Sequence, residues 1–463
     1  MASSSKGTVT RRLPHPTPLP AASSSNDADS DDSSKLDRNI RRKQMIAVFG
    51  SVFLFFILMN AVPLVLTGDR ATQQVEFHTA IQLDDDNKNT EMPRWMRDYF
   101  RWHAQQRRKL TAGSNEWKSM KFLLMQCLPN SRKCGGTADR LKPLPVMLLM
   151  AHKSRRLLLI KWGRPAELEA FLQPPQGGMD WRVPDWLHQQ QEFRQGPRAT
   201  NIEELIELTT NSEEFPMVKA RVQAHDHGSV YYNEQRQQPD EPTFEQVYHL
   251  CWRVLFTPAH AVAKRIEQQF ENSGMVPGHY VGIHIRALYG VSERDPAMIE
   301  HWTRNAIHCA SQLEKQQLHS TAGPFYLSSD SSVALAVGMA YGMELGAQVV
   351  TRQTAEEKAP KQPYHLDKAP KSAKPSEFYD TFVDLYLLAM GRCVTYNMGG
   401  YGTWALYISP YTNHNNQSCS FQHHNASGIH KCEWAGARNP SKAMTKQQQT
   451  TIPNKALFLP PMK

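Results

Sequence analysis

The segment from Tyr280 to Arg286, with the sequence YVGIHIR, constrains the fold of this chain more than any other. Its apolar, β-branched run is typical of a strand that is buried on both faces of a sheet. Because the run ends in His284 and Arg286, the strand would carry a cation to the carboxyl edge of the sheet. Ligands of open α/β sheets bind at that edge, and a planar guanidinium suits a phosphate. A salt-bridged arginine at a strand end is the other interpretation of the same residues.

Strands alternate with helices in two blocks of the chain, which predicts an α/β fold. In the first block we expect a strand at 122–127, a glycine turn, a helix at 139–152 and a strand at 156–162. In the second block we expect helices at 244–256, 259–270, 295–313, 331–342 and 377–390, and strands at 280–285, 324–328, 347–351 and 393–397. Two such blocks predict two Rossmann-like domains that face a cleft.

Residues 45–66 predict a membrane anchor, because they carry no charge and are long enough to span a hydrocarbon core of about 30 Å. Basic residues precede this segment closely, whereas only Arg70 follows it closely; they are Lys35, Arg38, Arg41, Arg42 and Lys43. The positive-inside rule therefore places the N-terminus in the cytoplasm and the rest of the chain in the lumen, as in a single-pass type II protein.

Composition divides the chain further. We predict a disordered cytoplasmic tail at 1–44, the transmembrane signal anchor at 45–66, a stem at 67–116, an N-terminal domain with an inserted elaboration at 117–243, a C-terminal donor-binding domain at 244–435 and a polar tail at 436–463. The formal net charge of +9 is spread along the chain without interleaved aromatic residues. This charge favours an anionic small molecule or glycan and argues against nucleic acid as a partner.

The seven cysteines all follow the predicted anchor, so some of them should pair in an oxidising lumen. Cys127 with Cys134 and Cys419 with Cys432 would close short loops, although sequence alone does not fix the pairing. We expect Cys251, Cys309 and Cys393 to pack as small apolar residues. Asn416 and Asn425 begin N-glycosylation acceptor sequences. Five Cys and His residues at 419–432 have the types but not the spacing of a zinc site, so we expect no metal.

The turn that contains Gly136, Asp139 and Arg140 is the first candidate binding element. Glycine allows a ligand to approach the backbone, and a helix N-terminus offers N–H groups to an anion. Asp139 as a helix cap is an equally good interpretation. The lysine and hydroxyl residue of a phosphate-binding P-loop are missing here, which argues against kinase chemistry.

The loop after Arg286 supplies the second candidate element. Glu293 is our candidate general base, because a cleft carboxylate can accept the proton of an attacking hydroxyl. Asp295 precedes Pro296 and is better explained as a cap of the following helix.

Two further elements follow later strands. Ser329 and Asp330 end a strand, where an acid could accept hydrogen bonds from a base or ribose, or cap the next helix. Gly400, Tyr401 and Gly402 form a glycine-rich turn whose successive N–H groups would make an anion-binding nest.

Taken together, HIR, YLSSD, DLYLLAMGRCVTYNMGGYGTWA and the earlier GGTADRL and RRLLLIKW resemble the motifs of GDP-fucose-dependent fucosyltransferases. The resemblance is to the α1,6-, α1,2- and protein O-fucosyltransferase superfamily, and it covers residues 122–408. It implies a GT-B fold, a Golgi location, GDP-fucose as donor, inversion at the sugar and no requirement for a metal. Arg286 would hold the β-phosphate, His284 the nucleotide and Asp330 guanine or ribose. The expected donor contacts are His284, Arg286, Ser329, Asp330, Gly400, Tyr401, Gly402, Gly136, Asp139 and Arg140.

The chain departs from the superfamily at several motif positions, including Ala287, Tyr289 and Asp139. Two alternatives therefore stand beside a fucosyltransferase with a glycan or glycoprotein acceptor. One is a luminal glycan-binding or scaffold protein that has lost catalysis, and the other is a transferase of a different nucleotide sugar.

Overall fold

The structure is a computed structural model. It describes residues 92–129, 134–210, 215–221, 227–236, 241–287, 295–313, 323–352, 366, 373–397, 400–410, 420–423 and 432–434. None of the helices in these ranges is long and apolar enough to cross a membrane. The predicted anchor at 45–66 and both predicted tails lie outside them, as do Glu293, Asn416 and Asn425.

The first sheet is parallel where its four strands pair and has the order β2-β1-β5-β4. Its strands are β1 (Phe122–Cys127), β2 (Leu157–Trp162), β4 (Arg198–Ala199) and β5 (Met217–Arg221). The helices of this part are α2 (Arg94–Lys109), α3 (Thr137–Leu141), α4 (Leu144–Lys153), α5 (Asp185–Gln189), α6 (Gln191–Arg194), α7 (Ile202–Thr210) and α8 (His227–Glu234). The helix predicted at 139–152 is thus two helices, because Pro143 interrupts the first one.

The second sheet has the order β12-β11-β10-β7-β8-β9, and all its pairs are parallel except β11 with β12. Its strands are β7 (Val281–Ile285), β8 (Phe325–Ser329), β9 (Val349–Thr351), β10 (Cys393–Tyr396), β11 (Ser420–His423) and β12 (Cys432–Trp434). The associated helices are α9 (Phe244–Leu255), α10 (His260–Ser273), α11 (Pro296–Leu313), α12 (Ser332–Glu344), α13 (Tyr379–Ala389) and α14 (Gly400–Ile408). Two short strands, β3 (Leu172–Gln173) and β6 (Thr257–Pro258), pair with each other.

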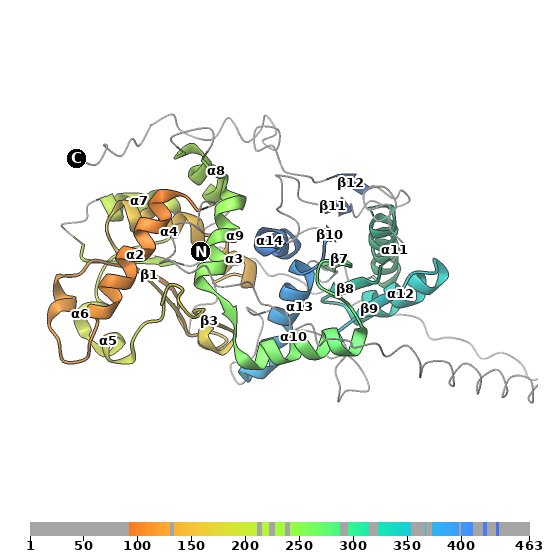
Figure 1. Cartoon of the computed structure of the whole chain (residues 1–463), viewed down its shortest axis with the longest axis horizontal. Helices are drawn as coiled ribbons and strands as arrows, with labels where there is room; N and C mark the ends of the chain where they lie inside the picture. Colours follow the sequence, from red (N-terminus) through yellow and green to blue (C-terminus); the bar gives the residue numbers. More distant parts are fainter. Residues whose placement is uncertain are drawn as a thin grey trace, which may run out of the picture. The chain divides into compact units, whose positions relative to one another are not determined.

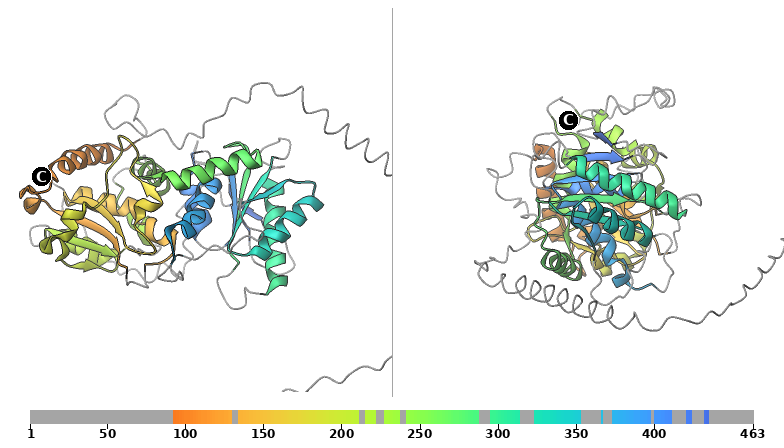
Figure 2. Two further views of the ribbon diagram at one scale, coloured as in Figure 1. Left: turned by 90° about the horizontal axis from the view of Figure 1, so that it is seen from below. Right: turned by 90° about the vertical axis from the view of Figure 1, so that its right-hand side faces the viewer.

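Helices cover both faces of the second sheet. α11 and α12 contact one face, and α13 contacts the other (Figure 1 and Figure 2). Strand β7 lies in the middle: the chain goes from it to β8 and β9 on one side, and β10 then pairs on its other side. The strand order therefore reverses between β7 and β10, which makes this the switch point of the sheet.

Helix α2 shows that the prediction of a stem at 67–116 is wrong for residues 94–109. Met96, Tyr99 and Phe100 are buried, and the Tyr99 hydroxyl donates to the carbonyl of Arg156 at 3.0 Å. The basic residues of α2 conceal this apolar stripe in the composition, although the stripe recurs at helical spacing. Residues 94–109 are consequently part of the globular fold.

Five cysteines have clear states in the described part of the chain. Cys127 and Cys134 form the predicted disulfide, and Cys251 is a buried free thiol as expected. Cys309 and Cys393 are disulfide-bonded, so the expectation that they pack as free apolar residues is wrong. The predicted pair of Cys419 with Cys432 includes a residue outside the described part of the chain.

Candidate functional site

Strand β7 delivers Arg286 to the switch point as the sequence predicts. Ile283 and Ile285 are fully buried on one face, and His284 is 7% exposed on the other. Arg286 directly follows the strand and is half-buried. Arg286 therefore lies at the carboxyl edge of the sheet, beside the end of β10.

Asn397, which follows β10, clamps the backbone of Arg286. Its Oδ1 accepts a hydrogen bond from the Arg286 N–H at 2.9 Å, and its Nδ2 donates to the Arg286 carbonyl at 3.0 Å. Asn397 is only 1% exposed. Sequence reasoning missed this residue, and the only signal for it was an amide directly after the last buried strand.

Asp330 fixes the next residue of the same turn from the side of β8. Its Oδ1 accepts from the Ala287 N–H at 2.7 Å. The cap of α12 is Ser331, whose Oγ accepts from the Ala334 N–H at 3.4 Å. Asp330 thus positions the turn after β7 in this structure. Ser329 is buried and its Oγ accepts from the Ser331 N–H at 3.2 Å, so it contributes to the same local turn.

The glycine turn at 400–402 is the first turn of helix α14. Gly402 lies against the ends of β10 and β7: a Cβ on it would be 2.5 Å from the Tyr396 Cβ and 3.4 Å from the His284 Nδ1. The Tyr401 ring lies 5.1 Å from the His284 ring, and its hydroxyl donates to the Thr381 carbonyl. The N–H groups of a first helical turn have no partner within the helix, so α14 directs donors and a positive dipole end to the switch point.

Lys142 brings a second cation to this place. Its Nζ would be 2.6 Å from a Cβ on Gly400, so the ammonium lies at the first residue of α14. Lys142 follows α3, and the Ala138 Cβ is also close to Gly400. Sequence reasoning ended at Arg140 and missed this lysine, which lies two residues further along the chain, directly after the GGTADRL motif.

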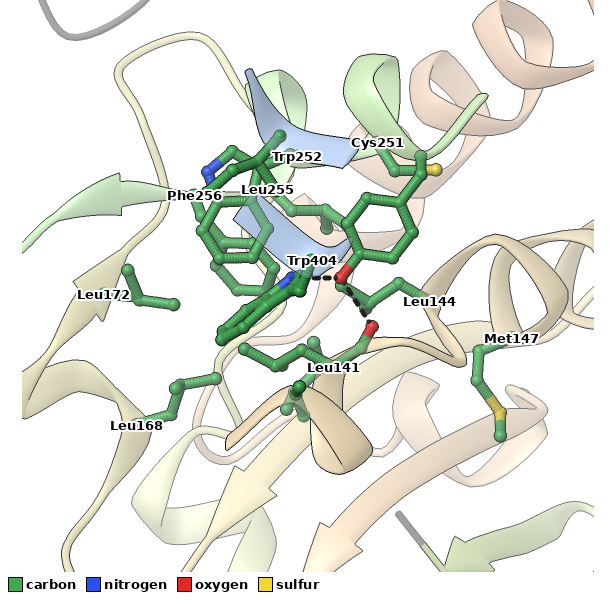
Figure 3. Packing of buried hydrophobic residues seen from close by; sticks show 14 of the residues in the cluster. Leu141, Leu144, Met147, Leu168, Leu172, Cys251, Trp252, Leu255, Phe256 and Trp404 are labelled. Carbon is green, nitrogen blue, oxygen red and sulfur yellow. Dashed lines mark hydrogen bonds between the residues drawn. The ribbon is translucent and has the colours of Figure 1, made fainter. Parts of the chain in front are cut away.

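Buried aromatic residues hold α14 against α9 and α3. The Trp404 Nε1 donates to the Tyr248 hydroxyl at 2.8 Å, and that hydroxyl donates to the Leu141 carbonyl at 2.9 Å. Figure 3 shows Trp404 among Trp252, Leu255 and Phe256, with both hydrogen bonds as dashed lines. Burial raises the pKa of the Tyr248 hydroxyl well above its ordinary value, so it remains protonated and donates. This packing fixes α14 relative to Lys142.

Asp139 and Arg140 shape the loop after β1. The Asp139 Oδ2 accepts from the Gly136 N–H at 2.9 Å, which is the cap interpretation of this residue. Arg140 is fully buried: its Nε donates to the Gly135 carbonyl at 3.0 Å, its Nη1 donates to the Arg164 carbonyl, and it stacks on a tryptophan ring. Gly135 has a φ of +75°, which favours glycine. Both side chains therefore hold the loop in place.

A buried ionic network lies beneath the end of β8. Asp384 accepts from the Tyr326 hydroxyl at 2.7 Å, the Ser328 Oγ at 3.0 Å and the Arg352 Nη1 at 2.8 Å. Burial lowers the pKa of Arg352, but Asp384 and Asp380 more than offset this and the net direction is upward. The charged arginine thus ties the residue after β9 to α13, and nothing in the local sequence predicted this.

The predicted site residues fall into two groups within the described part of the chain. Arg286, His284, Asp330, Gly400, Tyr401 and Gly402 converge at the switch point, and Asn397 joins them. Gly136 caps α3, and Asp139 and Arg140 lie within this helix, which precedes Lys142. No group of three or more His, Cys, Asp and Glu side chains that could hold a metal ion occurs among the described residues.

No protein-family model and no curated protein matches this chain. A variant of Arabidopsis thaliana FUT1 in complex with GDP is 12% identical over 72% of this chain and 79% of its own, with a TM-score of 0.47. NodZ α-1,6-fucosyltransferase soaked with GDP-fucose is 14% identical over 66% of this chain and 95% of its own, with a TM-score of 0.40. Fucosyltransferase NodZ from Bradyrhizobium is 15% identical over 66% and 96%, with a TM-score of 0.38. The structure is thus distantly similar to those of fucosyltransferases.

Proposed function

We propose that this protein is a type II Golgi glycosyltransferase that transfers fucose from GDP-fucose to a glycan or glycoprotein. The observation that carries the proposal is the turn after β7, where Arg286 is held at the switch point by Asn397 and Asp330 supports the next residue. Ligands of parallel sheets bind at such points, and the planar guanidinium of an arginine held there suits a diphosphate. The two sheets would belong to GT-B-like domains with the donor between them.

The positive groups at the switch point suit the departure of GDP. In the proposed reaction an acceptor hydroxyl attacks C1 of fucose from the face opposite to the diphosphate, so the configuration inverts. The C1–O bond to the β-phosphate breaks, and its electron pair stays on the phosphate oxygen. Arg286, Lys142 and the N–H groups of α14 would stabilise that charge. Glu293 remains our candidate base for the hydroxyl proton.

These charges also support the proposal of a reaction that needs no metal. A divalent cation commonly neutralises a leaving diphosphate, and two side-chain cations with a helix N-terminus can do the same. The matching assay is transfer in the presence of EDTA. Unchanged activity is expected, and activity restored only by added Mg²⁺ or Mn²⁺ contradicts this part of the proposal.

A panel of nucleotide sugars tests the donor. The full-length protein is titrated with GDP, GDP-fucose, GDP-mannose and UDP-galactose, and sugar release is followed in parallel. We expect GDP and GDP-fucose to bind and Arg286→Ala to weaken both. Arg304→Ala is the matched control, because Arg304 pairs with Glu300 and Glu344 on the surface. Equal binding of GDP by the wild type and Arg286→Ala would refute the phosphate role of Arg286.

The same panel separates the two alternatives. Binding of GDP-fucose without hydrolysis or transfer indicates a protein that has lost catalysis. Turnover of another nucleotide sugar indicates a different donor. Protease protection of the chain in intact microsomes, with accessibility of the first 44 residues only, tests the proposed orientation.

A further inference from the structure

A cavity of about 320 Å³ lies at the amino ends of β1 and β2. Trp102, Gln106 and Lys109 line it from one face of α2, since they are spaced four and three residues apart. Lys121 lines it just before β1, and Arg155 just before β2. The loop with Gly136 leaves the opposite, carboxyl end of β1, about 17–20 Å away for strands of this length. The cavity is therefore separate from the donor site.

The lining of the cavity is positively charged. Lys109, Lys121 and Arg155 are opposed by one lining carboxylate, that of Glu116. Lys109 and Arg155 are exposed at the surface, whereas Trp102 is half-buried with its ring 5.7 Å from that of Tyr99. A concave site with cations of one sign concentrates anions. The tryptophan adds a fixed apolar wall to this charged site.

Arg155 is placed at the cavity at a conformational cost. Its φ of 52° makes it the one residue other than glycine with positive φ among the described residues. It follows α4, and the Arg156 N–H donates back to the Ala151 carbonyl at 2.9 Å. Glycine is the usual residue at such a helix end, because a Cβ is unfavourable there. A glycine at position 155 would be enough to end the helix. The arginine that stands there instead adds a guanidinium to the lining of the cavity.

We propose that this cavity binds an anionic sugar residue, carboxylated or sulfated, with its ring against Trp102 and its acidic group between Lys109 and Arg155. The volume is at the lower end of the range for small-molecule sites, which fits one sugar. The Gln106 amide, the Ser119 hydroxyl and the Glu116 carboxylate would meet sugar hydroxyls. The proposal stands independently of the donor assignment.

The test is a titration of the full-length protein with four probes: methyl glucuronide, methyl glucoside 6-sulfate, neutral methyl glucoside and inorganic sulfate. We expect saturable binding of at least one anionic sugar that weakens as salt is raised. The neutral glucoside and inorganic sulfate should bind at least about tenfold more weakly. The two anionic probes distinguish a carboxylate from a sulfate as the acidic group. Equal binding of neutral and anionic sugars, sulfate binding as tight as either, or no saturable binding would overturn the proposal.

Arg155→Gly separates binding from folding. This variant removes the strained Cβ, so Tm should be unchanged or higher, while affinity for the anionic sugar should fall at least about fivefold. Arg155→Lys should retain part of the affinity, because it keeps the charge. GDP binding should be the same in all three proteins. Wild-type sugar affinity in Arg155→Gly contradicts the proposal, and a failed donor assignment leaves this result unaffected.

Discussion

The clamp between Asn397 and Arg286 leads to a quantitative prediction. Asn397→Ala removes both hydrogen bonds, of 2.9 and 3.0 Å, and leaves a backbone N–H and a backbone carbonyl of Arg286 without these partners. A buried polar group that loses its hydrogen bond costs about 1–3 kcal/mol, so the variant should lose about 2–4 kcal/mol of unfolding free energy. For a domain of this size that corresponds to a fall in Tm of roughly 5–15 °C.

The same variant should also bind GDP more weakly. With its backbone released, Arg286 has to be ordered when the diphosphate binds, and ordering one long side chain costs about 0.5–1.5 kcal/mol. The expected loss of affinity is therefore about two- to tenfold. Calorimetric titration with GDP at a temperature where the variant is fully folded measures it, and scanning calorimetry measures the Tm.

Tyr99→Phe is a matched control for this prediction. The Tyr99 hydroxyl donates to the Arg156 carbonyl at 3.0 Å and accepts from the Leu158 N–H at 3.0 Å, so it also holds a strand by one donor and one acceptor. It lies at the amino edge of the first sheet, away from the switch point. Its loss should lower Tm comparably and leave GDP affinity unchanged. If both variants lose stability and both bind GDP like the wild type, the clamp does not prepare a phosphate site.

Three further predictions concern α14 and α2. Gly402→Ala places a Cβ 2.5 Å from the Tyr396 Cβ, so α14 must shift. We expect the free energy of unfolding, measured in urea, to fall by about 1–3 kcal/mol and GDP to bind more weakly. An unchanged stability would contradict the contact. Lys142→Met removes a cation from the positive end of α14, so the free energy of unfolding should rise by about 0.3–1 kcal/mol while GDP affinity falls. A GDP affinity equal to that of the wild type would exclude Lys142 from the site. Burial lowers the pKa of His103 to about 4 in the folded protein. As pH drops from about 6.5 to about 4, this histidine is therefore protonated in the unfolded chain but not in the folded one, and stability falls. His103→Gln, compared with the wild type by urea unfolding at neutral pH and at about pH 4.5, should reduce this loss by up to about 2–3 kcal/mol, and an identical pH dependence would contradict it.

The central strands could be predicted from the sequence because burial on both faces leaves continuous apolar runs. Strand β7 begins one residue later than expected, and α11 extends to Leu313 as predicted. Helix α2 was missed as part of the core because its basic residues dominate its composition. Its apolar stripe was visible, but the position next to the predicted anchor favoured a stem.

The candidate site was only partly predictable for a different reason. Arg286 could be placed because it ends a recognisable strand, whereas Asn397 acts on it across 111 residues of sequence. Asp139 and Arg140 have residue types that suit an anion site, yet the structure uses them to hold their own loop. Residue type thus predicted which loops form the candidate site. Only the hydrogen-bond partners distinguish the side chains that shape a loop from those that would contact a ligand.

The hydrogen bonds that hold the loops in place support the proposed diphosphate site better than any other part of the proposed donor site. Asn397 and Asp330 form hydrogen bonds with the backbone of the turn after β7, and the hydrogen bond between Trp404 and Tyr248 fixes α14. Rigid charges that are already in position stabilise a developing negative charge without the cost of reorganisation. These hydrogen bonds fix the backbone at the proposed phosphate site, and none of them involves the sugar. Substitutions in this framework should therefore weaken GDP and GDP-fucose by the same factor, whereas a residue that selects fucose should change only the ratio of the two affinities.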